Sequence, residues 1–256
     1  IYRAEIISAL SWRIKPVPIV LLAGPESIVG APSVVRRDDH LDMIAAVGKP
    51  SRIVLARSVD EGQTFEVVTD PLLEAADPWE NGSVGSPSVF DFQGSTFLLY
   101  EGGQGAGIGL AKVLTNHAHR TQPNPILFPT NVMDPVFWRD ITNVGRPQAV
   151  VVGDSVRILF TARGIEGFSA MTSAGNAAAE PNDSIGLATT IDLQSFALFP
   201  TGPVYTRLVN LRAYLGESEA TMRMAPNGAE MVFVSSDASG EAKTGLVRVL
   251  GRGGAN

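Results

Sequence analysis

Four charged residues in this 256-residue chain have side chains and positions suited to chemistry. Glu101 stands between an apolar run and a glycine-rich stretch, and Glu219 lies within a sequence phrase that recurs along the chain. Two carboxyl groups can act as general acid and base when burial or a like-charged neighbour keeps one of them protonated. Arg146 lies in another copy of the phrase and Arg163 follows it, and two guanidinium forks suit a phosphate or a carboxylate.

Each of these residues also has a plainer interpretation. Glu101 can be an exposed loop acid beside a glycine-rich turn, and the two arginines can form salt bridges that close a ring of sheets. Glu217, on the same strand face as Glu219, is expected to be a solvated loop carboxylate. For Glu219 the structural and the catalytic interpretations both stay open.

The recurrent phrase is what positions these residues. Its copies are Gly30–Val35, Gly85–Phe90 and Gly145–Val150, each with a Pro two residues after the Gly, and a weaker copy is Ser218–Met222. A polar turn, a β-rich run, a second turn and a run ending in small residues follow each copy. Periods of roughly 40 to 70 residues that each hold several short strands are typical of a β-propeller. The sequence therefore predicts an all-β fold.

We expect a five-bladed β-propeller with incomplete blades at the chain ends. A single domain, 1–256, would hold a partial blade at 1–22, full blades at 30–73, 85–129 and 145–205, and a three-strand blade at 216–250. The outermost strands of the full blades are expected at Thr64–Val68, Pro125–Phe128 and Ser195–Phe199. Because the first blade lacks two strands, either other segments complete the ring or the chain is a fragment. An open sandwich of irregular hairpins is the alternative fold.

The stretch Ser58–Phe65 matches the Asp-box pattern, Ser-x-Asp-x-Gly-x-Thr followed by an aromatic residue. In such a turn the Asp caps backbone amides, the Gly takes a positive φ and the aromatic ring packs between sheets. These turns usually lie on the outer rim, so we interpret this one as structural. Thr190–Phe196 is a looser version at the same place in a later repeat.

Three motifs together resemble the five-bladed propeller glycosidases: Ser86–Phe90, the run Phe97–Tyr100 after a glycine turn, and Ile108–Ala111. That superfamily includes arabinanases, β-xylosidases, invertases, levansucrases and mannoside phosphorylases. The resemblance is carried by blade-forming positions, which indicate architecture more than chemistry. It implies a site in the axial funnel, built from the starts of the innermost strands. It also implies a glycoside hydrolase or phosphorylase that acts on an oligosaccharide or polysaccharide without a cofactor.

In those enzymes an acidic residue commonly stands directly before the Pro of the phrase. Here that position holds Ala31, Ser86 and Arg146, and Glu219 in the copy where Ala replaces Pro. Glycoside hydrolysis needs two carboxyl groups, about 5–5.5 Å apart for retention or about 6.5–9.5 Å for inversion. The resemblance makes Glu219 the candidate acid and Glu101 the candidate base or sugar-hydroxyl acceptor. The catalytic positions of this chain are therefore degenerate.

Three other functions stay open at this point. Ala and Ser in place of the acids favour a non-catalytic carbohydrate-binding or scaffold propeller. An anion held by Arg146 and Arg163 would fit a phosphorylase or a substrate that contains uronic acid. A sialidase-like propeller, suggested by the Asp-box pattern, would need an arginine triad and a nucleophilic Tyr in the funnel.

Further residues are expected near the funnel, because the turns after the second strands should open on the same face as the starts of the first strands. This rule places Asp237 beside Glu101 and Arg163. Trp79 and Trp138 are loop aromatic residues whose ring faces can stack on a pyranose, although we prefer packing between blades for both. The predicted substrate-binding residues are therefore Arg146, Arg163, Trp138, Asp237 and Trp79.

The composition argues against several classes of protein. A formal charge of −6 gives no basic surface for nucleic acid, and no apolar run of about 18 residues predicts a membrane span. His40, His117 and His119 form no metal-binding set, and no nucleotide-binding motif occurs. The absence of Cys rules out disulfides but leaves the compartment open, with an extracellular or periplasmic location favoured.

Overall fold

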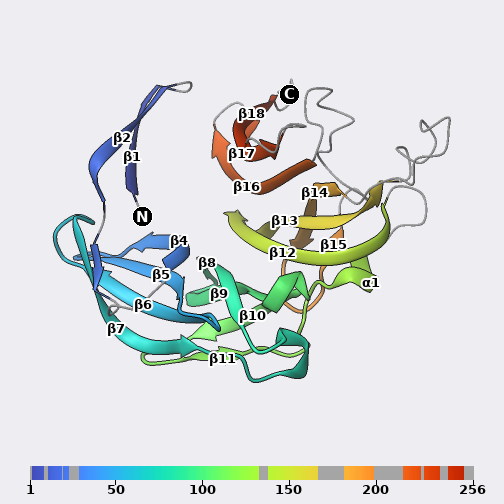
Figure 1. The fold of residues 1–256 in the computed structure, drawn as a ribbon, viewed down its shortest axis with the longest axis horizontal. Helices are drawn as coiled ribbons and strands as arrows, with labels where there is room; N and C mark the ends of the chain where they lie inside the picture. Colours follow the sequence, from blue (N-terminus) through green and yellow to red (C-terminus); the bar gives the residue numbers. More distant parts are fainter. Residues whose placement is uncertain are drawn as a thin grey trace.

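A computed structural model describes residues 2–8, 11–18, 20–22, 29–132, 138–166, 182–198, 216–225, 228–236 and 242–250. Side chains are described for residues 30–132, 141–164 and 183–198. Nearly all of the secondary structure in these ranges is β-strand, and most strands pair antiparallel (Figure 1). The all-β prediction is confirmed.

The first full sheet follows the first copy of the phrase. Its strands β4 (Val29–Arg36), β5 (Leu41–Val47), β6 (Arg52–Ser58) and β7 (Thr64–Leu73) pair antiparallel in sequence order. β3 (Val20–Leu22) lies parallel to β7 as a fifth strand. β1 (Tyr2–Ser8) and β2 (Ser11–Pro18) form a separate two-stranded sheet. The described strands before residue 23 therefore contribute to two sheets.

The second sheet consists of β8 (Val84–Phe92), β9 (Ser95–Gly102), β10 (Ile108–Val113) and β11 (Ala118–Arg120). The prediction that Pro125–Phe128 forms its outermost strand is wrong, because β11 pairs with β10 at that position. Pro123 and Pro125 have no N–H to donate to a ladder. Residues 125–128 instead meet β10 through an isolated bridge between Ile108 and Leu127.

The third sheet joins two repeats. β12 (Trp138–Val152), β13 (Ser155–Glu166), β14 (Asn182–Thr190) and β15 (Ala197–Leu198) form its first part. β16 (Gly216–Ala225), β17 (Gly228–Ser236) and β18 (Ala242–Leu250) form an antiparallel second part. The parts meet where Asp183 pairs in parallel with Gly216. Two 3-10 turns, η1 (Pro78–Glu80) and η2 (Gly103–Gly105), and a short helix α1 (Pro129–Val132) lie in the connections.

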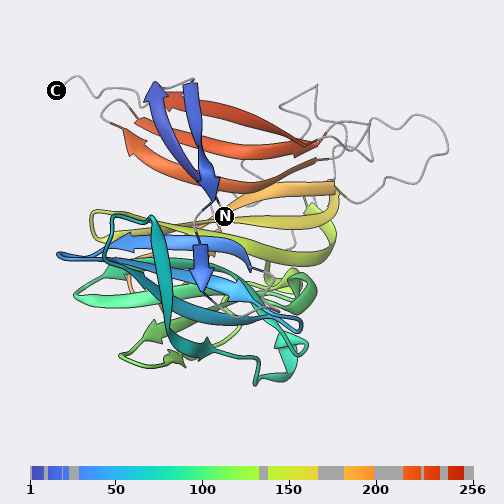
Figure 2. The same ribbon diagram turned by 60° about the vertical axis from the view of Figure 1, so that its left-hand side comes forward.

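The first strands of successive repeats lie beside one another near the centre of the molecule. β4 contacts β8, β8 contacts β12 and β12 contacts β16. Figure 1 shows β7 and β11 at the outer edge. In Figure 2 the orange-red strands β16, β17 and β18 lie above the yellow-green β12 and β13, and the lighter blue sheet of β4 to β7 and the green sheet of β8 to β11 lie below. This radial succession of antiparallel sheets is the arrangement of a β-propeller.

Apolar side chains fill the spaces between neighbouring sheets. One buried cluster contains Ile53 of the first sheet and Leu98 of the second. Another contains Phe90 of the second sheet and Ile158 of the third. Burial of such side chains between layers is the main force that holds the sheets together.

The glycine in the third strand of the second and third repeats makes room for an aromatic ring. Gly109 pairs with Tyr100, and Gly186 pairs with Phe160. A Cβ atom on either glycine would lie less than 3.0 Å from that ring. The repeated Ile-Gly-Leu-Ala motif is therefore a packing motif.

The turn that starts at Ser58 is held by a side-chain carboxylate. Asp60 Oδ1 accepts hydrogen bonds from the backbone N–H of Gln63 at 3.0 Å and of Thr64 at 2.9 Å, and from Ser58 Oγ at 2.7 Å. The hydrogen bonds from Thr64 and Ser58 lower the pKa of Asp60 well below its ordinary value. Gly62 has a φ of 79°, and the ring after the turn is buried. This turn is a structural link between β6 and β7.

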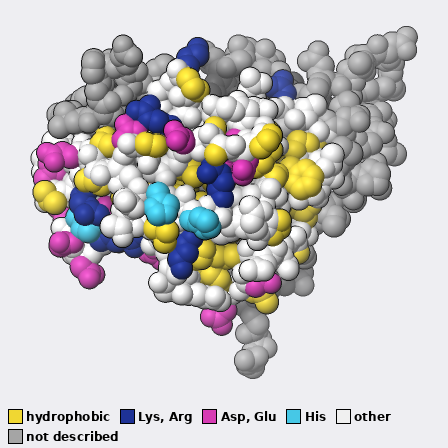
Figure 3. All heavy atoms as spheres, turned by 90° about the horizontal axis from the view of Figure 1, so that it is seen from below, with side chains coloured by type: hydrophobic (Ala, Val, Ile, Leu, Met, Phe, Trp, Pro, Cys, Tyr) yellow, Lys and Arg dark blue, Asp and Glu magenta, His cyan; other side chains and the backbone are white. Residues whose placement is uncertain are grey.

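In the described part of the chain, no helix has the length and apolar character needed to cross a membrane. On the face seen in Figure 3, acidic, basic and histidine side chains are interspersed with hydrophobic ones. Charges of opposite sign are therefore mixed on that face.

Candidate functional site

The copies of the recurrent phrase form the same β-bulge in the first strand of their repeats. The register against the second strand shifts between Gly30 and Ser33, between Gly85 and Ser88, and between Gly145 and Gln148. The residue before each Pro has a positive φ: 45° for Ala31, 46° for Ser86 and 51° for Arg146. Residues other than Gly seldom adopt this conformation, and backbone strain of this kind clusters at functional sites.

The fourth copy of the phrase has the same shift in register. Ser218 pairs with Val234 and Thr221 with Val232, so that Glu219 lies inside the irregular stretch of β16. The side chain of Glu219 lies outside the described residues. Gly216 is the direct partner of Asp183, so β16 begins beside the end of the third repeat.

The serine that follows the Pro links one repeat to the next. The backbone N–H of Val89 donates to Ser33 Oγ at 3.0 Å, and the N–H of Ala149 donates to Ser88 Oγ at 2.9 Å. Ser88 is fully buried. These bonds fix successive innermost strands relative to one another and hold the bulges in place.

A polar pocket of about 260 Å³ lies where the second repeat meets the third. It is formed by the end of β9, the η2 turn, the bulge of β12, the end of β13 and the start of β14. The lining residues are Glu101, Gln104, Gly105, Asn143, Gly145, Arg146, Thr161, Arg163 and Asp183. Three residues predicted from the sequence, Glu101, Arg146 and Arg163, are thus brought together in one pocket.

Glu101 supports the bulge that carries Arg146. Its Oε2 accepts a hydrogen bond from the backbone N–H of Arg146 at 2.8 Å. The carboxylate lies directly over Gly145, where a Cβ atom would approach it to less than 3.0 Å. Gly145 is therefore required for this contact, and the half-buried Glu101 reaches across from one repeat to the next.

The preceding junction lacks this contact although its backbone is the same. Ala46, which pairs with Gly30, corresponds to Glu101, which pairs with Gly85. A Cβ on Gly85 would meet Ala46 Cβ at 3.9 Å, an ordinary van der Waals distance. The Glu101–Arg146 contact is thus a specialisation of the junction that contains the pocket.

A row of polar side chains crosses the third sheet at the pocket. Asn143 of β12 pairs with Arg163 of β13, which in turn pairs with Asp183 of β14. Directly opposite residues in an antiparallel sheet share a face, so the row presents an amide, a guanidinium and a carboxylate side by side. Arg163 is exposed. The pocket therefore offers both hydrogen-bond donors and acceptors.

The η2 turn forms the opposite wall of the pocket. Asn143 Nδ2 donates a short hydrogen bond to the carbonyl oxygen of Gln104, which has a φ of 60°. Gly105 packs so closely on Asn143 that a Cβ would lie 2.9 Å from the Asn143 Cβ. This contact ties the glycine-rich loop to β12.

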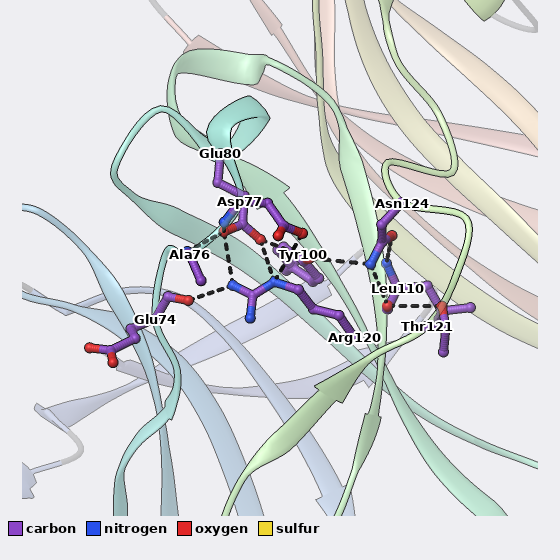
Figure 4. A network of polar contacts seen from close by, with 9 residues as sticks. All are labelled: Glu74, Ala76, Asp77, Glu80, Tyr100, Leu110, Arg120, Thr121 and Asn124. Carbon is purple, nitrogen blue, oxygen red and sulfur yellow. Dashed lines mark hydrogen bonds and ion pairs between the residues drawn. The ribbon is translucent and has the colours of Figure 1, made fainter.

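A buried ionic network holds Tyr100, near the end of β9 (Figure 4). Glu80 is fully buried, and its Oε1 accepts hydrogen bonds from Tyr100 Oη at 2.9 Å and Arg120 Nε at 2.8 Å. Its Oε2 accepts bonds from Arg120 Nη2 at 2.8 Å and from the N–H groups of Ala76 and Asp77 at 2.7 and 3.0 Å. Every carboxylate oxygen is thus satisfied, as a buried charge requires.

This network fixes the residue next to the pocket. Burial by itself would raise the pKa of Glu80, but the hydrogen bonds from Arg120 and the backbone amides outweigh burial and leave it below its ordinary value. Burial, together with the Glu80 charge, raises the pKa of Tyr100 far above its ordinary value. Tyr100 directly precedes Glu101, so the network anchors the strand end that carries the pocket carboxylate.

Trp79 does not line the pocket. Its ring lies 5.8 Å from that of Tyr100, and it packs on Gly102, where a Cβ would lie less than 3.0 Å from the indole. A packing role between the η1 turn and β9 accounts for these contacts. The expectation that Trp79 stacks on a sugar in this pocket is therefore corrected.

Two other predicted residues cannot be placed at the pocket. Trp138 begins β12, but its side chain lies outside the described residues, and Asp237 lies outside them altogether. Within the ranges that the structure describes, no group of three or more His, Asp or Glu side chains could hold a metal ion.

Asp183 and Asn143 are pocket residues that the sequence analysis missed. Asp183 is the second residue of β14 and precedes its apolar part, and Asn143 precedes the third copy of the phrase by two residues. Their place at the pocket follows from the strand register, which a single sequence does not reveal. A signal for Asp183 was available in its position at the start of a third strand, which could have been compared with the same position in the other repeats.

Comparison with known proteins gives a fold but no close relative. Neither a protein-family model nor a curated protein sequence matches this chain. A glycoside hydrolase structure aligns with a TM-score of 0.67 and 15% identity, over 89% of this chain and 72% of the other. The chain has the fold of this hydrolase.

Two further structures extend the likeness. A thermostable family-43 glycoside hydrolase aligns with a TM-score of 0.63 and 16% identity, over 99% of this chain and 83% of the other. An exo-1,5-α-L-arabinanase from a bovine ruminal metagenomic library aligns with a TM-score of 0.62 and 12% identity, over 92% and 81%. The resemblance to the propeller glycosidases is thereby confirmed for the architecture.

Proposed function

We propose that this protein is a carbohydrate-active β-propeller that takes a saccharide in the pocket between its second and third repeats. The observation that carries the proposal is the convergence of Glu101, Asp183, Arg146 and Arg163 on that pocket. A polyhydroxylated ligand needs both acceptors and donors, which carboxylates and guanidinium groups supply. The likeness in fold to glycoside hydrolases agrees with this proposal.

The size of the pocket limits how much of a saccharide it encloses. Its volume of about 260 Å³ lies just below the range of about 300–1,000 Å³ that is typical of drug-sized ligands. We therefore propose that one sugar unit occupies the pocket, while the rest of an oligosaccharide or polysaccharide lies outside it.

The proposal includes a five-bladed ring. Blades at 30–73, 85–129 and 145–205, a three-strand blade at 216–250 and a partial blade at 1–22 remain our interpretation of the chain. The shared bulge and the serine links between innermost strands support equivalent blades.

In the catalytic form of the proposal, the protein is a glycoside hydrolase or phosphorylase. Glu219 would donate a proton to the glycosidic oxygen, and Glu101 would act as base or hold a sugar hydroxyl. Glu101 Oε2 already accepts the Arg146 N–H, so Oε1 is the oxygen that would serve the ligand. Asp183 adds a second carboxylate on the opposite side of Arg163 from Asn143.

Turnover of a broad panel of chromogenic glycosides, with and without orthophosphate, tests the catalytic form. Glu219→Gln should abolish turnover while saccharide binding and thermal unfolding stay unchanged, because the amide cannot donate the proton. Glu217→Gln, two residues away on the same strand, is the matched control and should keep its activity. Full activity of the Glu219 variant would exclude it as the acid.

A binding module is the second candidate, and the residues at the bulges favour it. Ala31 and Ser86 occupy positions whose strained backbone is kept, yet neither can exchange a proton as a carboxyl group does. A glycan-binding measurement on the purified chain separates the candidates. Binding of an oligosaccharide that is never converted supports this second candidate, whereas conversion of the bound oligosaccharide rules it out.

A further inference from the structure

We infer that the saccharide bound in this pocket carries an oxyanion, a carboxylate or a phosphate ester, which the Arg163 guanidinium recognises. The inference rests on the proposed function, since it concerns the substrate class of the same pocket.

The Arg163 guanidinium lines the pocket and has no ion-pair partner among the side chains that the structure describes. Among the described residues, no carboxylate oxygen lies within 4.0 Å of its nitrogen atoms. The recorded hydrogen bond of this residue uses its backbone, where the carbonyl accepts from Thr142 Oγ1 at 3.4 Å. The salt-bridge alternative considered for Arg163 from the sequence is therefore not found in the described part of the chain.

Most other arginines with described side chains are held by a carboxylate. The pairs are Arg36–Glu61, Arg37–Asp91, Arg52–Asp70, Arg57–Asp42 and Arg120–Glu80. Arg163 thus lines the pocket with a planar fork that no carboxylate of the described residues holds. Such forks match the two oxygens of a carboxylate or phosphate.

Arg146 brings a second cation to the same pocket from the neighbouring strand. It occupies the bulge position that holds Ala31 and Ser86 in the preceding repeats, with the same positive φ. The three bulges therefore share a positive φ at this position but carry different side chains. The bulge that lines the pocket carries a cation, Arg146.

Glu101 brings a negative charge to the same pocket, and its contact with the bulge fixes where that charge lies. One of its oxygens is engaged by the Arg146 backbone N–H, so the residue acts as a positioning group for the bulge. Asp183 lies opposite Arg163 on the neighbouring strand, and these two described side chains form no ion pair with each other. A ligand oxyanion can therefore form charge-assisted bonds to Arg163, which are roughly twice as strong as bonds between neutral groups.

Titration calorimetry on the full chain tests the inference. The ligands are galacturonic acid against galactose, glucose 6-phosphate against glucose, and orthophosphate alone. We expect one acidic sugar to bind at least about tenfold more tightly than its neutral counterpart, as loss of a charge-assisted bond implies. The acidic sugar that shows this tighter binding identifies the recognised group as a carboxylate or as a phosphate ester.

Variants on one strand provide the controls. Arg163→Gln should remove the preference for the acidic sugar, and Arg163→Lys should keep only part of it, because a Lys retains the charge but not the fork. Arg157→Gln changes the same residue type at the far end of β13, outside the pocket, and should leave binding unchanged. Thermal unfolding of each variant verifies that the fold is intact.

The possible results separate the two proposals. Equal affinity for acidic and neutral sugars, unaffected by Arg163→Gln, would overturn the inference and leave the proposed function standing. Orthophosphate binding as tightly as both acidic sugars would also overturn it, because the ion alone would then be recognised. Failure of every sugar to bind would overturn the proposed function itself.

Discussion

The contact between Glu101 and Gly145 gives the sharpest prediction. In Gly145→Ala, the new methyl group would lie less than 3.0 Å from the Glu101 carboxylate and must displace it. The hydrogen bond from the Arg146 N–H to Glu101 Oε2, now 2.8 Å long, is then lost. The bulge that carries Arg146 would lose its support from the neighbouring repeat.

The size of the effect follows from two opposing contributions. A hydrogen bond to a charged group contributes about 1.5–3 kcal/mol. Replacing Gly by Ala in a strand returns about 0.5–1 kcal/mol, because the unfolded chain loses conformational freedom. We therefore expect a net loss of about 1–2 kcal/mol, or a fall of roughly 2–8 °C in Tm for a domain of this size.

Gly85→Ala is the matched control for this change. It alters the same position of the preceding copy, where the nearest atoms would be 3.9 Å away, so stability should stay the same or rise by up to about 1 kcal/mol. Urea unfolding of both variants measures the difference. A double-mutant cycle with Glu101→Ala adds a stricter test, because Gly145→Ala should cost nothing once the carboxylate is gone. Equal stabilities of the two glycine variants, or additive effects in the cycle, would refute the reasoning.

Three further predictions concern the packing that supports the site. Arg120→Met leaves the buried Glu80 carboxylate without its cation and should cost about 3–5 kcal/mol in urea unfolding at pH 7. Because the folded pKa of Glu80 is below its ordinary value of 4.5, this stabilisation is present above that pH and is lost on further acidification, so wild type and variant should converge in acid. Ser88→Ala leaves the buried N–H of Ala149 without a hydrogen-bond acceptor and should lower the free energy of unfolding by about 1–3 kcal/mol. An unchanged urea midpoint would contradict the role of Ser88 as a link between repeats. Gly186→Ala drives a Cβ into a buried ring and should cost about 1–3 kcal/mol by calorimetry, and an unchanged Tm would contradict the packing account.

The repeats made much of the fold predictable. Copies of one phrase, each followed by short apolar runs and glycine turns, set the order of the strands from β4 to β14. The error at Pro125–Phe128 arose because the apolar run suggested a strand, whereas Pro125 within it and Pro123 before it have no backbone N–H to donate. The polar segment that forms β11 has no apolar run that would predict a strand, although Arg120 within it donates a hydrogen bond to the buried Glu80.

Part of the candidate site was predictable for a similar reason. Glu101 and Arg163 lie near the ends of the second strands of consecutive repeats, and Arg146 lies in the phrase itself. Their positions in the repeat therefore place them on one face. The positive φ of Arg146 was not predictable, because neither Arg nor the Pro after it indicates a left-handed residue. Asp183 joins the pocket through strand pairing across the third sheet, which only the three-dimensional register reveals.

The junction between the second and third repeats is the proposed saccharide-binding site of this protein. The most direct measurement is a glycan array probed with the wild-type chain, Gly145→Ala and Gly85→Ala under identical conditions. We predict that the wild type and Gly85→Ala bind the same oligosaccharide, and that Gly145→Ala loses this binding because the Arg146 bulge is no longer held by Glu101. Unchanged binding by the Gly145 variant, or no binding of any glycan by the wild type, would contradict the account.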